Sequence, residues 1–185
     1  PGGFDVRGVE GKLRATTWAR ENNVPFFGIC LGMQVMLIEA ARSLAGHAQA
    51  TSTEFDAETA APVISMIDEQ CRIVSKGGTM RLGSYPCDLK KGSKAQQFYG
   101  SDSVKERHRH RYEFNNAYKA DLEKQGIVFS GTCPSNGLVE VAEYIDHPFM
   151  MAVQFHPEYK ATPLKPHPLL HAFMKTVVAK RNDLR

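Results

Sequence analysis

The chain has 185 residues, 42% of them hydrophobic, and a formal net charge of +3. This length is enough for one domain with a real core and too short for two comfortable ones. Lysines and arginines are scattered along the chain rather than gathered in an arm or tail, so the charge pattern does not point to a nucleic-acid partner.

The first half of the chain predicts a helix, a strand and a second helix in succession. Spaced apolar residues among charged ones predict a helix over 10–23, with Trp18 facing the core. The apolar run 24–27 is typical of a buried parallel strand. Beyond a glycine-flanked turn, apolar residues that include Met33 and Met36 recur at spacings of three and four, which predicts a packed helix closed by Gly46.

The remainder of the chain is dominated by strand patterns. We expect strands at 62–67, 109–114, 127–132, 138–144 and 149–155, a glycine-bounded hairpin over 77–88, and helices at 94–99, 117–125 and 167–181. This order indicates an α/β domain with a mixed sheet.

The four cysteines are Cys30, Cys71, Cys87 and Cys133, and they form neither a C-x-x-C pair nor a zinc or disulfide pattern. A reduced, cytoplasmic setting fits best. The longest apolar runs are far shorter than a membrane span, so we expect no membrane partner. We interpret all of these cysteines except Cys30 as packing or incidental residues.

Cys30 stands between Gly28 and Gly32 at the junction of the predicted strand and helix, which is the pattern of a nucleophile elbow with cysteine in place of serine. We expect side chains at either glycine to collide with neighbouring backbone. A helix N-terminus favours thiolate and should lower the pKa of Cys30, while the amide of Leu31 points to where an oxyanion would form. A lone cysteine is more often a buried structural residue, but the elbow context reverses that preference.

A thiol nucleophile needs a general base, and that base needs an orienting group. His156, Pro157 and Glu158 follow a strand-like run, and in extended backbone His156 and Glu158 would project to the same side. The alternative is a surface turn in which the two residues happen to flank a proline. Combined with the cysteine elbow, the pattern favours a base and its orienter.

These two motifs resemble the class I (triad) glutamine amidotransferases. The resemblance rests on Gly28-Ile29-Cys30-Leu31-Gly32-Met33-Gln34 and His156-Pro157-Glu158. Further stretches resemble one branch of this family, in which a synthetase domain aminates UTP to CTP. They are Pro1-Gly2-Gly3-Phe4, Ser52-Thr53-Glu54-Phe55, Gly78-Thr79-Met80-Arg81-Leu82-Gly83, Glu106-Arg107-His108-Arg109-His110-Arg111-Tyr112-Glu113, and the proline-rich stretch from Thr162-Pro163 to His167-Pro168.

The resemblance implies a flavodoxin-like fold with a central mixed, mostly parallel sheet flanked by helices. It implies that Cys30, His156 and Glu158 form a catalytic triad that hydrolyses the side-chain amide of L-glutamine through a γ-glutamyl thioester. The other implied roles belong to the substrate site: amides of Gly3 and Leu31 in the oxyanion hole, the neighbouring Gly32, Met33 and Gln34, and Glu54 and Arg111 gripping glutamine. Selecting free glutamine, with its α-ammonium and α-carboxylate, independently requires one fixed anion and one fixed cation.

The same resemblance implies partners beyond these residues. No cofactor or metal is expected in this domain, whereas ATP and magnesium with UTP, and GTP as effector, belong to the full-length enzyme, which we expect to be a homo-oligomer. Pro1-Gly2-Gly3-Phe4 reads as a turn after a strand, so we expect preceding elements and the synthetase domain to lie outside this chain. Asp5 stands where the family usually has glycine, and Asp tolerates a positive φ better than most residues.

Two questions remain open at this point: the role of the run from Arg107 to Arg111, and the activity of the whole chain. The run from Arg107 to Arg111 could bind phosphate or, through its histidines, a metal, although contact with the synthetase domain or the substrate fits better. For the whole chain, the alternatives to an amidotransferase are a free-standing γ-glutamyl hydrolase of the same triad class and a catalytically silent binding module of the same fold.

Overall fold

The computed structural model describes residues 1–4, 6–66 and 80–183. Asp5, Cys71 and the first part of the predicted hairpin lie outside these residues. The strands are β1 (Phe26–Ile29), β2 (Thr51–Ser52), β3 (Pro62–Ser65), β4 (Arg81–Leu89), β5 (Ser103–His110), β6 (Glu113–Phe114), β7 (Ile127–Thr132), β8 (Val139–Tyr144) and β9 (Met150–Val153). The α-helices are α1 (Val9–Glu21), α2 (Leu31–Ser43), α4 (Lys94–Tyr99), α5 (Lys119–Glu123) and α6 (Pro168–Asp183), with short 3-10 helices η2 (Asn116–Tyr118) and η3 (Pro157–Lys160).

Two sheets organise the described residues, a six-stranded sheet of order β1-β9-β8-β7-β4-β5 and a small sheet of order β2-β3-β6. The predicted mixed sheet is confirmed. Among the described strands, however, parallel pairing occurs only between β1 and β9 and between β2 and β3. The expectation of mostly parallel strands is therefore wrong for this part of the chain, because β7, β8 and β9 are joined by connections short enough to allow only antiparallel neighbours.

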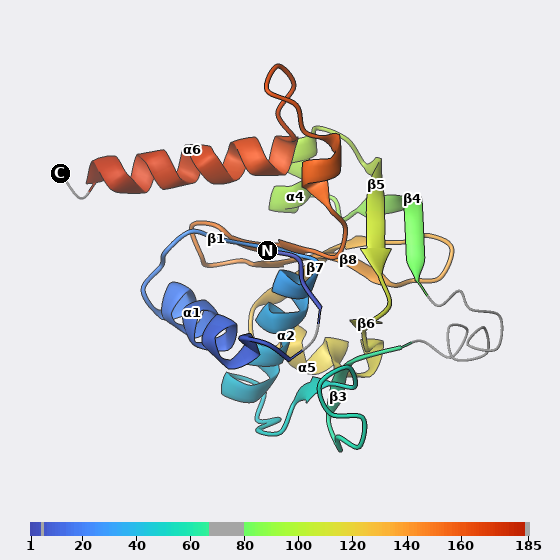
Figure 1. Ribbon diagram of the computed structural model, residues 1–185. Helices are drawn as coiled ribbons and strands as arrows, with labels where there is room; N and C mark the ends of the chain where they lie inside the picture. Colours follow the sequence, from blue (N-terminus) through green and yellow to red (C-terminus); the bar gives the residue numbers. More distant parts are fainter. Residues whose placement is uncertain (5, 67–79, 184–185) are drawn as a thin grey trace.

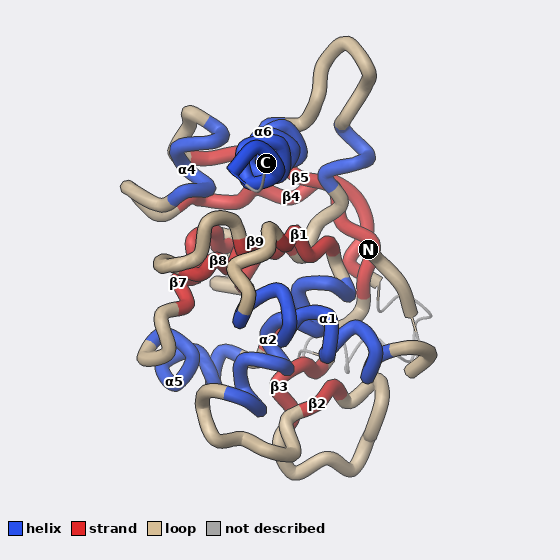
Figure 2. The backbone as a smooth tube through the Cα atoms, turned by 90° about the vertical axis from the view of Figure 1, so that its left-hand side faces the viewer, coloured by secondary structure: helices blue, strands red, loops and turns tan. Residues whose placement is uncertain are grey.

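Helices cover both faces of the six-stranded sheet. α4 and α6 lie on one face, while α1, α2 and α5 lie on the other, with the small sheet beyond α2 (Figures 1 and 2). α2 packs against β1 and β9 on one side and against α1 and the small sheet on others, so nearly every residue of it is buried. A helix that is apolar on all sides is expected in such a central position.

The alternation of side chains along β9 connects the two cores. Met150 and Ala152 join the cluster under α2, whereas Met151 and Val153 join the cluster under α6. This two-sided burial is typical of an interior strand. The prediction that Met33 and Met36 are packing residues is confirmed, since both are fully buried.

Two local expectations are wrong. Trp18 is 59% exposed, because Val9, Leu13 and Thr16 occupy the buried side of α1 and Trp18 points away from them. The strand predicted at 109–114 is instead the end of β5 followed by β6, and β5 extends back to Ser103. The strand was not predicted because β5 alternates between charged side chains rather than between apolar and polar ones.

No helix in the described ranges is long and apolar enough to cross a bilayer.

Candidate active site

Cys30 occupies a sharp turn between β1 and α2. Its backbone has φ 54° and ψ −105°, a conformation that costs energy for any residue other than glycine. The turn is held because the Cys30 N–H donates to Val153 O at 2.8 Å, while the Cys30 carbonyl accepts from Met33 N at 3.0 Å. The predicted elbow is confirmed as a backbone conformation, and its strain is the kind that marks functional turns.

The two glycines of the turn differ in what they permit. A Cβ at Gly28 would lie 2.7 Å from the backbone C and O of Gly32 and 2.9 Å from Ala152 Cβ. A Cβ at Gly32 would approach nothing closer than Pro1, at 3.8 Å. The predicted collision is therefore confirmed at Gly28 and wrong at Gly32, since only Gly28 faces the crossing backbone.

This difference supplies a matched test of stability. Gly28→Ala is expected to lower the free energy of unfolding by about 1–3 kcal/mol, because the chain at Gly32 must move. Gly32→Ala lies in the first turn of α2 and should be neutral or stabilising by up to about 1 kcal/mol. Urea unfolding of both variants measures this, and equal destabilisation would contradict the steric argument.

The electrostatic setting of Cys30 is opposite to the one expected. Its side chain is 3% exposed, and burial raises the pKa of the Cys30 thiol to about 12. The Leu31 N–H, which was expected to face an oxyanion, is hydrogen-bonded to the sulfur and lowers its pKa, but by less than burial raises it. The predicted net lowering is wrong because desolvation of the thiolate outweighs the helix terminus. Cys30 is thus a thiol at rest and needs a base.

His156 and Glu158 form that candidate base and its orienter. His156 Nδ1 lies 2.6 Å from Glu158 Oε1, and the imidazole stacks on the Tyr159 ring at 4.7 Å. The backbone N–H of His156 donates to Arg107 O at 2.8 Å, which ties the segment to the edge strand β5. The predicted pairing is confirmed, but the backbone between the two residues is not extended, because Pro157 begins the 3-10 helix η3.

The three predicted triad residues line one cavity of about 310 Å³. Its lining residues are Gly2, Gly3, Phe4, Cys30, Arg109, His156, Glu158 and Tyr159. His156 Nε2 is buried and has no hydrogen-bond partner among the described residues, so Cys30 Sγ and this nitrogen are not yet hydrogen-bonded. Both groups nevertheless line the same cavity, which therefore holds a protonated thiol and an imidazole nitrogen that is able to accept its proton.

The predicted glutamine grip lies in an adjoining cavity of about 450 Å³. Its lining residues are Phe4, Glu54, Met80, Arg109, Arg111 and Tyr112. Glu54 and Arg111 therefore meet in one cavity although they are far apart in sequence. Phe4 and Arg109 line both cavities, so the cavity of the nucleophile and the cavity of the two opposite charges are neighbours.

The remaining predicted substrate residues lie around the nucleophile in different settings. A Cβ at Gly3 would come within 3.0 Å of Leu31 Cδ2, so the chain start passes directly over the beginning of α2. Met33 is fully buried in the core and is not among the lining residues of either cavity in the described part of the chain. Gln34 is also buried, and its amide donates to Tyr112 O at 3.1 Å.

Comparisons with known proteins identify the family of this chain. The family described as glutamine amidotransferase class-I matches residues 1–176. This chain belongs to that family. As an amidotransferase, it is similar to the CTP synthase of Moorella thermoacetica, with 55% identity over 174 residues that cover 94% of this chain and 32% of that protein. The CTP synthase of Aquifex aeolicus is 53% identical over 175 residues, covering 95% and 33% respectively.

The amidotransferase chain thus spans about a third of the length of the curated relatives that it matches. Among solved structures, it is similar to the glutaminase domain of Trypanosoma brucei CTPS with bound acivicin. The TM-score is 0.91 and the identity 42%, with 97% of this chain and 69% of that chain covered. The class I amidotransferase fold expected from the resemblance is confirmed.

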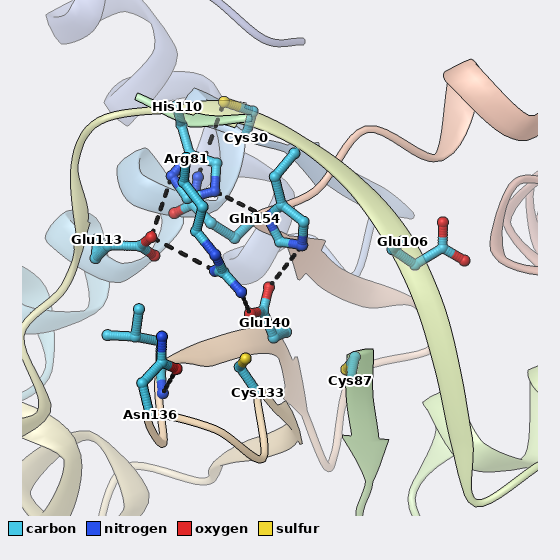
Figure 3. Close-up of polar contacts among 12 residues, drawn as sticks. Cys30, Arg81, Cys87, Glu106, His110, Glu113, Cys133, Asn136, Glu140 and Gln154 are labelled. Carbon is cyan, nitrogen blue, oxygen red and sulfur yellow. Dashed lines mark hydrogen bonds and ion pairs between the residues drawn. The ribbon is translucent and has the colours of Figure 1, made fainter. Parts of the chain in front are cut away.

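A buried charged network that the sequence did not reveal connects β4, β5 and β8 of this amidotransferase (Figure 3). Arg81 Nη2 lies 2.6 Å from Glu140 Oε1, and Arg81 Nη1 lies 3.5 Å from Glu113 Oε1. His108 and His110 complete it, each 2% exposed. The expectation that the 107–111 run contacts the synthetase domain or substrate is therefore wrong for the histidines, because alternation along β5 turns only the arginines outward.

The tautomers of the two histidines follow from one backbone carbonyl. Tyr112 O can only accept, so His110 Nδ1, 3.2 Å away, carries its proton and His110 Nε2 accepts from His108 Nδ1 at 2.9 Å. His108 Nε2 is then unprotonated and faces Glu140 Oε2 at 3.2 Å. Two acceptors at this distance require a shared proton, which fits the pKa of Glu140, raised by burial to about 7 despite Arg81.

We expect this network to make the free energy of unfolding greatest between about pH 4.5 and 6.5. Burial raises the pKa of Glu113 to about 8, so the folded state holds extra protons and loses stability as pH rises from 6.5 towards 8. Burial lowers the pKa of His108 to about 2 and of His110 to about 3, so both histidines lose stability as pH drops below 6.5. Glu113 and Glu140, whose pKa values burial raises from 4.5, offset this loss, so the net fall begins below about pH 4.5. Over the alkaline range Glu113 alone accounts for about 2 kcal/mol.

Glu140→Gln is the variant that tests this network. The amide can donate to His108 and accept from Arg81, so stability should be retained while the decline above pH 6.5 becomes shallower. Urea unfolding at a series of pH values measures both. An alkaline decline as steep as that of the parent chain would contradict the shared proton.

No group of three or more His, Cys, Asp or Glu residues suited to a metal ion occurs in the described ranges.

Proposed function

We propose that this chain hydrolyses the side-chain amide of L-glutamine, with Cys30 as nucleophile, His156 as general base and acid, and Glu158 as the group that orients the imidazole. The observation that carries the proposal is the single cavity lined by all three residues at a strained elbow. Membership in the class I amidotransferases supports it.

The reaction follows from the positions of these groups. His156 Nε2 takes the proton of Cys30 as the sulfur attacks the amide carbon, and the oxygen becomes an oxyanion that the amides of Leu31 and Gly3 would stabilise. His156 then gives its proton to the leaving nitrogen, and the C–N bond breaks. Ammonia departs, and the γ-glutamyl group remains on Cys30 as a thioester. Water, deprotonated by His156, attacks the thioester, which releases glutamate and restores the thiol.

Glu54 and Arg111 are proposed to select free glutamine. The α-ammonium of the substrate would pair with Glu54 and the α-carboxylate with Arg111, while the neighbouring cavity would hold the side-chain amide at Cys30. The α-amino and α-carboxyl groups of a residue within a protein carry no such charges, so they would form neither of these ion pairs.

The ammonia is proposed to serve the amination of UTP to CTP in a cytoplasmic full-length enzyme. The support is the similarity to CTP synthases over nearly the whole of this chain. In that enzyme a synthetase domain would bind ATP, magnesium and UTP, GTP would act as effector, and subunits would assemble into a homo-oligomer. The glutaminase half-reaction needs none of these groups.

Labelling with an electrophilic glutamine analogue, followed by mass spectrometry, tests the proposal. Modification of Cys30 that free glutamine prevents is the expected result. Protection by γ-glutamyl peptides but not by glutamine would instead identify a γ-glutamyl hydrolase. Absence of labelling, together with absence of ammonia release, would identify a binding module and overturn the proposal.

A further inference from the structure

Gln154 contacts the sulfur of Cys30 from inside the protein. Its side chain is fully buried, and its Nε2 lies 3.8 Å from Cys30 Sγ. The contact is a consequence of topology. β1 and β9 are parallel neighbours in which Ile29 lies opposite Val153, and each of these residues ends its strand. The residues that follow them, Cys30 and Gln154, are therefore brought together. Figure 3 marks the contact between Gln154 and the Cys30 sulfur as a dashed line.

The direction of this contact is set by a backbone carbonyl. Tyr112 O can only accept, so the Gln34 atom at 3.1 Å from it must be the amide nitrogen. The second hydrogen of that nitrogen is donated to Gln154 Oε1 at 3.4 Å. The oxygen of Gln154 is thereby turned towards Gln34, and its N–H group is left to face the sulfur.

We propose that Gln154 is a hydrogen-bond donor to the sulfur of Cys30 that orients it and stabilises its thiolate, and that Gln34 fixes the direction of this donor. The proposal deepens the function proposed above and rests on Cys30 being the nucleophile. It assigns Gln34 a positioning role through its side chain.

The need for such a donor follows from the burial of the nucleophile. A buried thiolate loses its hydration, and a hydrogen bond to the charged form offsets part of that loss. A neutral amide supplies this without adding a second charge to the site. Gln154 does not line the cavity that holds His156, so in the described part of the structure it approaches the sulfur from the side away from substrate and base.

The test measures the thiolate content of Cys30 directly. Gln154→Met replaces the amide with an apolar side chain of similar size, and Gln97→Met does the same to an exposed glutamine far from the site. Iodoacetamide is neutral and small, and its rate of reaction with Cys30 at neutral pH, read by peptide mass spectrometry, follows the thiolate fraction. We expect Gln154→Met to react about tenfold more slowly, as for a rise of one pKa unit, and Gln97→Met to react as the parent does.

Gln34→Met is the second variant, because it leaves Gln154 in place but releases its orientation. A smaller decrease in the same direction is expected. A folded Gln154→Met that reacts at the parental rate would overturn the proposal, and if that variant fails to fold, an unchanged rate in Gln34→Met would do so. A parent chain that releases no ammonia from glutamine would overturn the proposed function instead, since alkylation does not depend on glutamine.

Discussion

Cys30→Ala and His156→Ala are each expected to reduce glutamine hydrolysis by at least about 10⁴-fold, because either change removes a member of a unit that acts together. Glu158→Ala should leave about 10- to 100-fold more activity than these, since the imidazole keeps its stacking on Tyr159 and its backbone tie to β5. Ammonia release from glutamine under saturating conditions is the measurement.

Cys133→Ala is the matched control for the loss of a buried thiol. Cys133 lies in the loop after β7, where its sulfur contacts Ser135 Oγ at 3.2 Å. The Cys133→Ala variant should therefore retain parental activity. Equal activity in Cys30→Ala and the parent chain would end the mechanism. A loss of activity in Cys133→Ala as great as in Cys30→Ala would show that the assay reports folding rather than chemistry.

Arg111→Met is expected to raise KM for glutamine about 10- to 100-fold, the effect of losing one hydrogen-bonded charge pair. The value of kcat should change much less, because the α-carboxylate is held equally in the ground state and the transition state. Glu54→Gln should shift KM in the same direction through the α-ammonium. Steady-state kinetics separate the two constants.

Arg107→Met is the control for this prediction. Arg107 is exposed on β5, whose last residue precedes Arg111, and lines neither cavity among the described residues, so its substitution should leave KM unchanged. A fall in kcat without a change in KM for Arg111→Met would contradict the grip and place the guanidinium in the chemical step instead.

Much of the fold could be predicted from local patterns. The helix at 94–99 and the strand at 127–132 have the predicted bounds, because Ser93 caps the helix and the strand is a compact apolar run. The strand at 103–110 was missed, because its buried face carries Glu106, His108 and His110 rather than apolar residues. An alternation of charged residues with a period of two, rather than an alternation of apolar residues, was the signal that could have predicted this strand.

The candidate site was predictable where it depends on neighbours in sequence. The elbow at Cys30 and the pairing of His156 with Glu158 involve residues at most two apart, and both geometries are present. The joining of Glu54 with Arg111 came only from resemblance to a family, since no local rule relates residues so distant in the chain.

The amino-acid sequence alone determined the nucleophile turn, the base and the α/β class, because backbone conformation over a few residues depends on glycine, proline and local apolar spacing. Only the tertiary structure decided that burial makes Cys30 a thiol at rest, and which donor reaches its sulfur. Those properties depend on desolvation and on partners such as Gln154, which is 124 positions from Cys30. Such contacts arise from strand pairing across the sheet, and no pattern within a short stretch of sequence contains them.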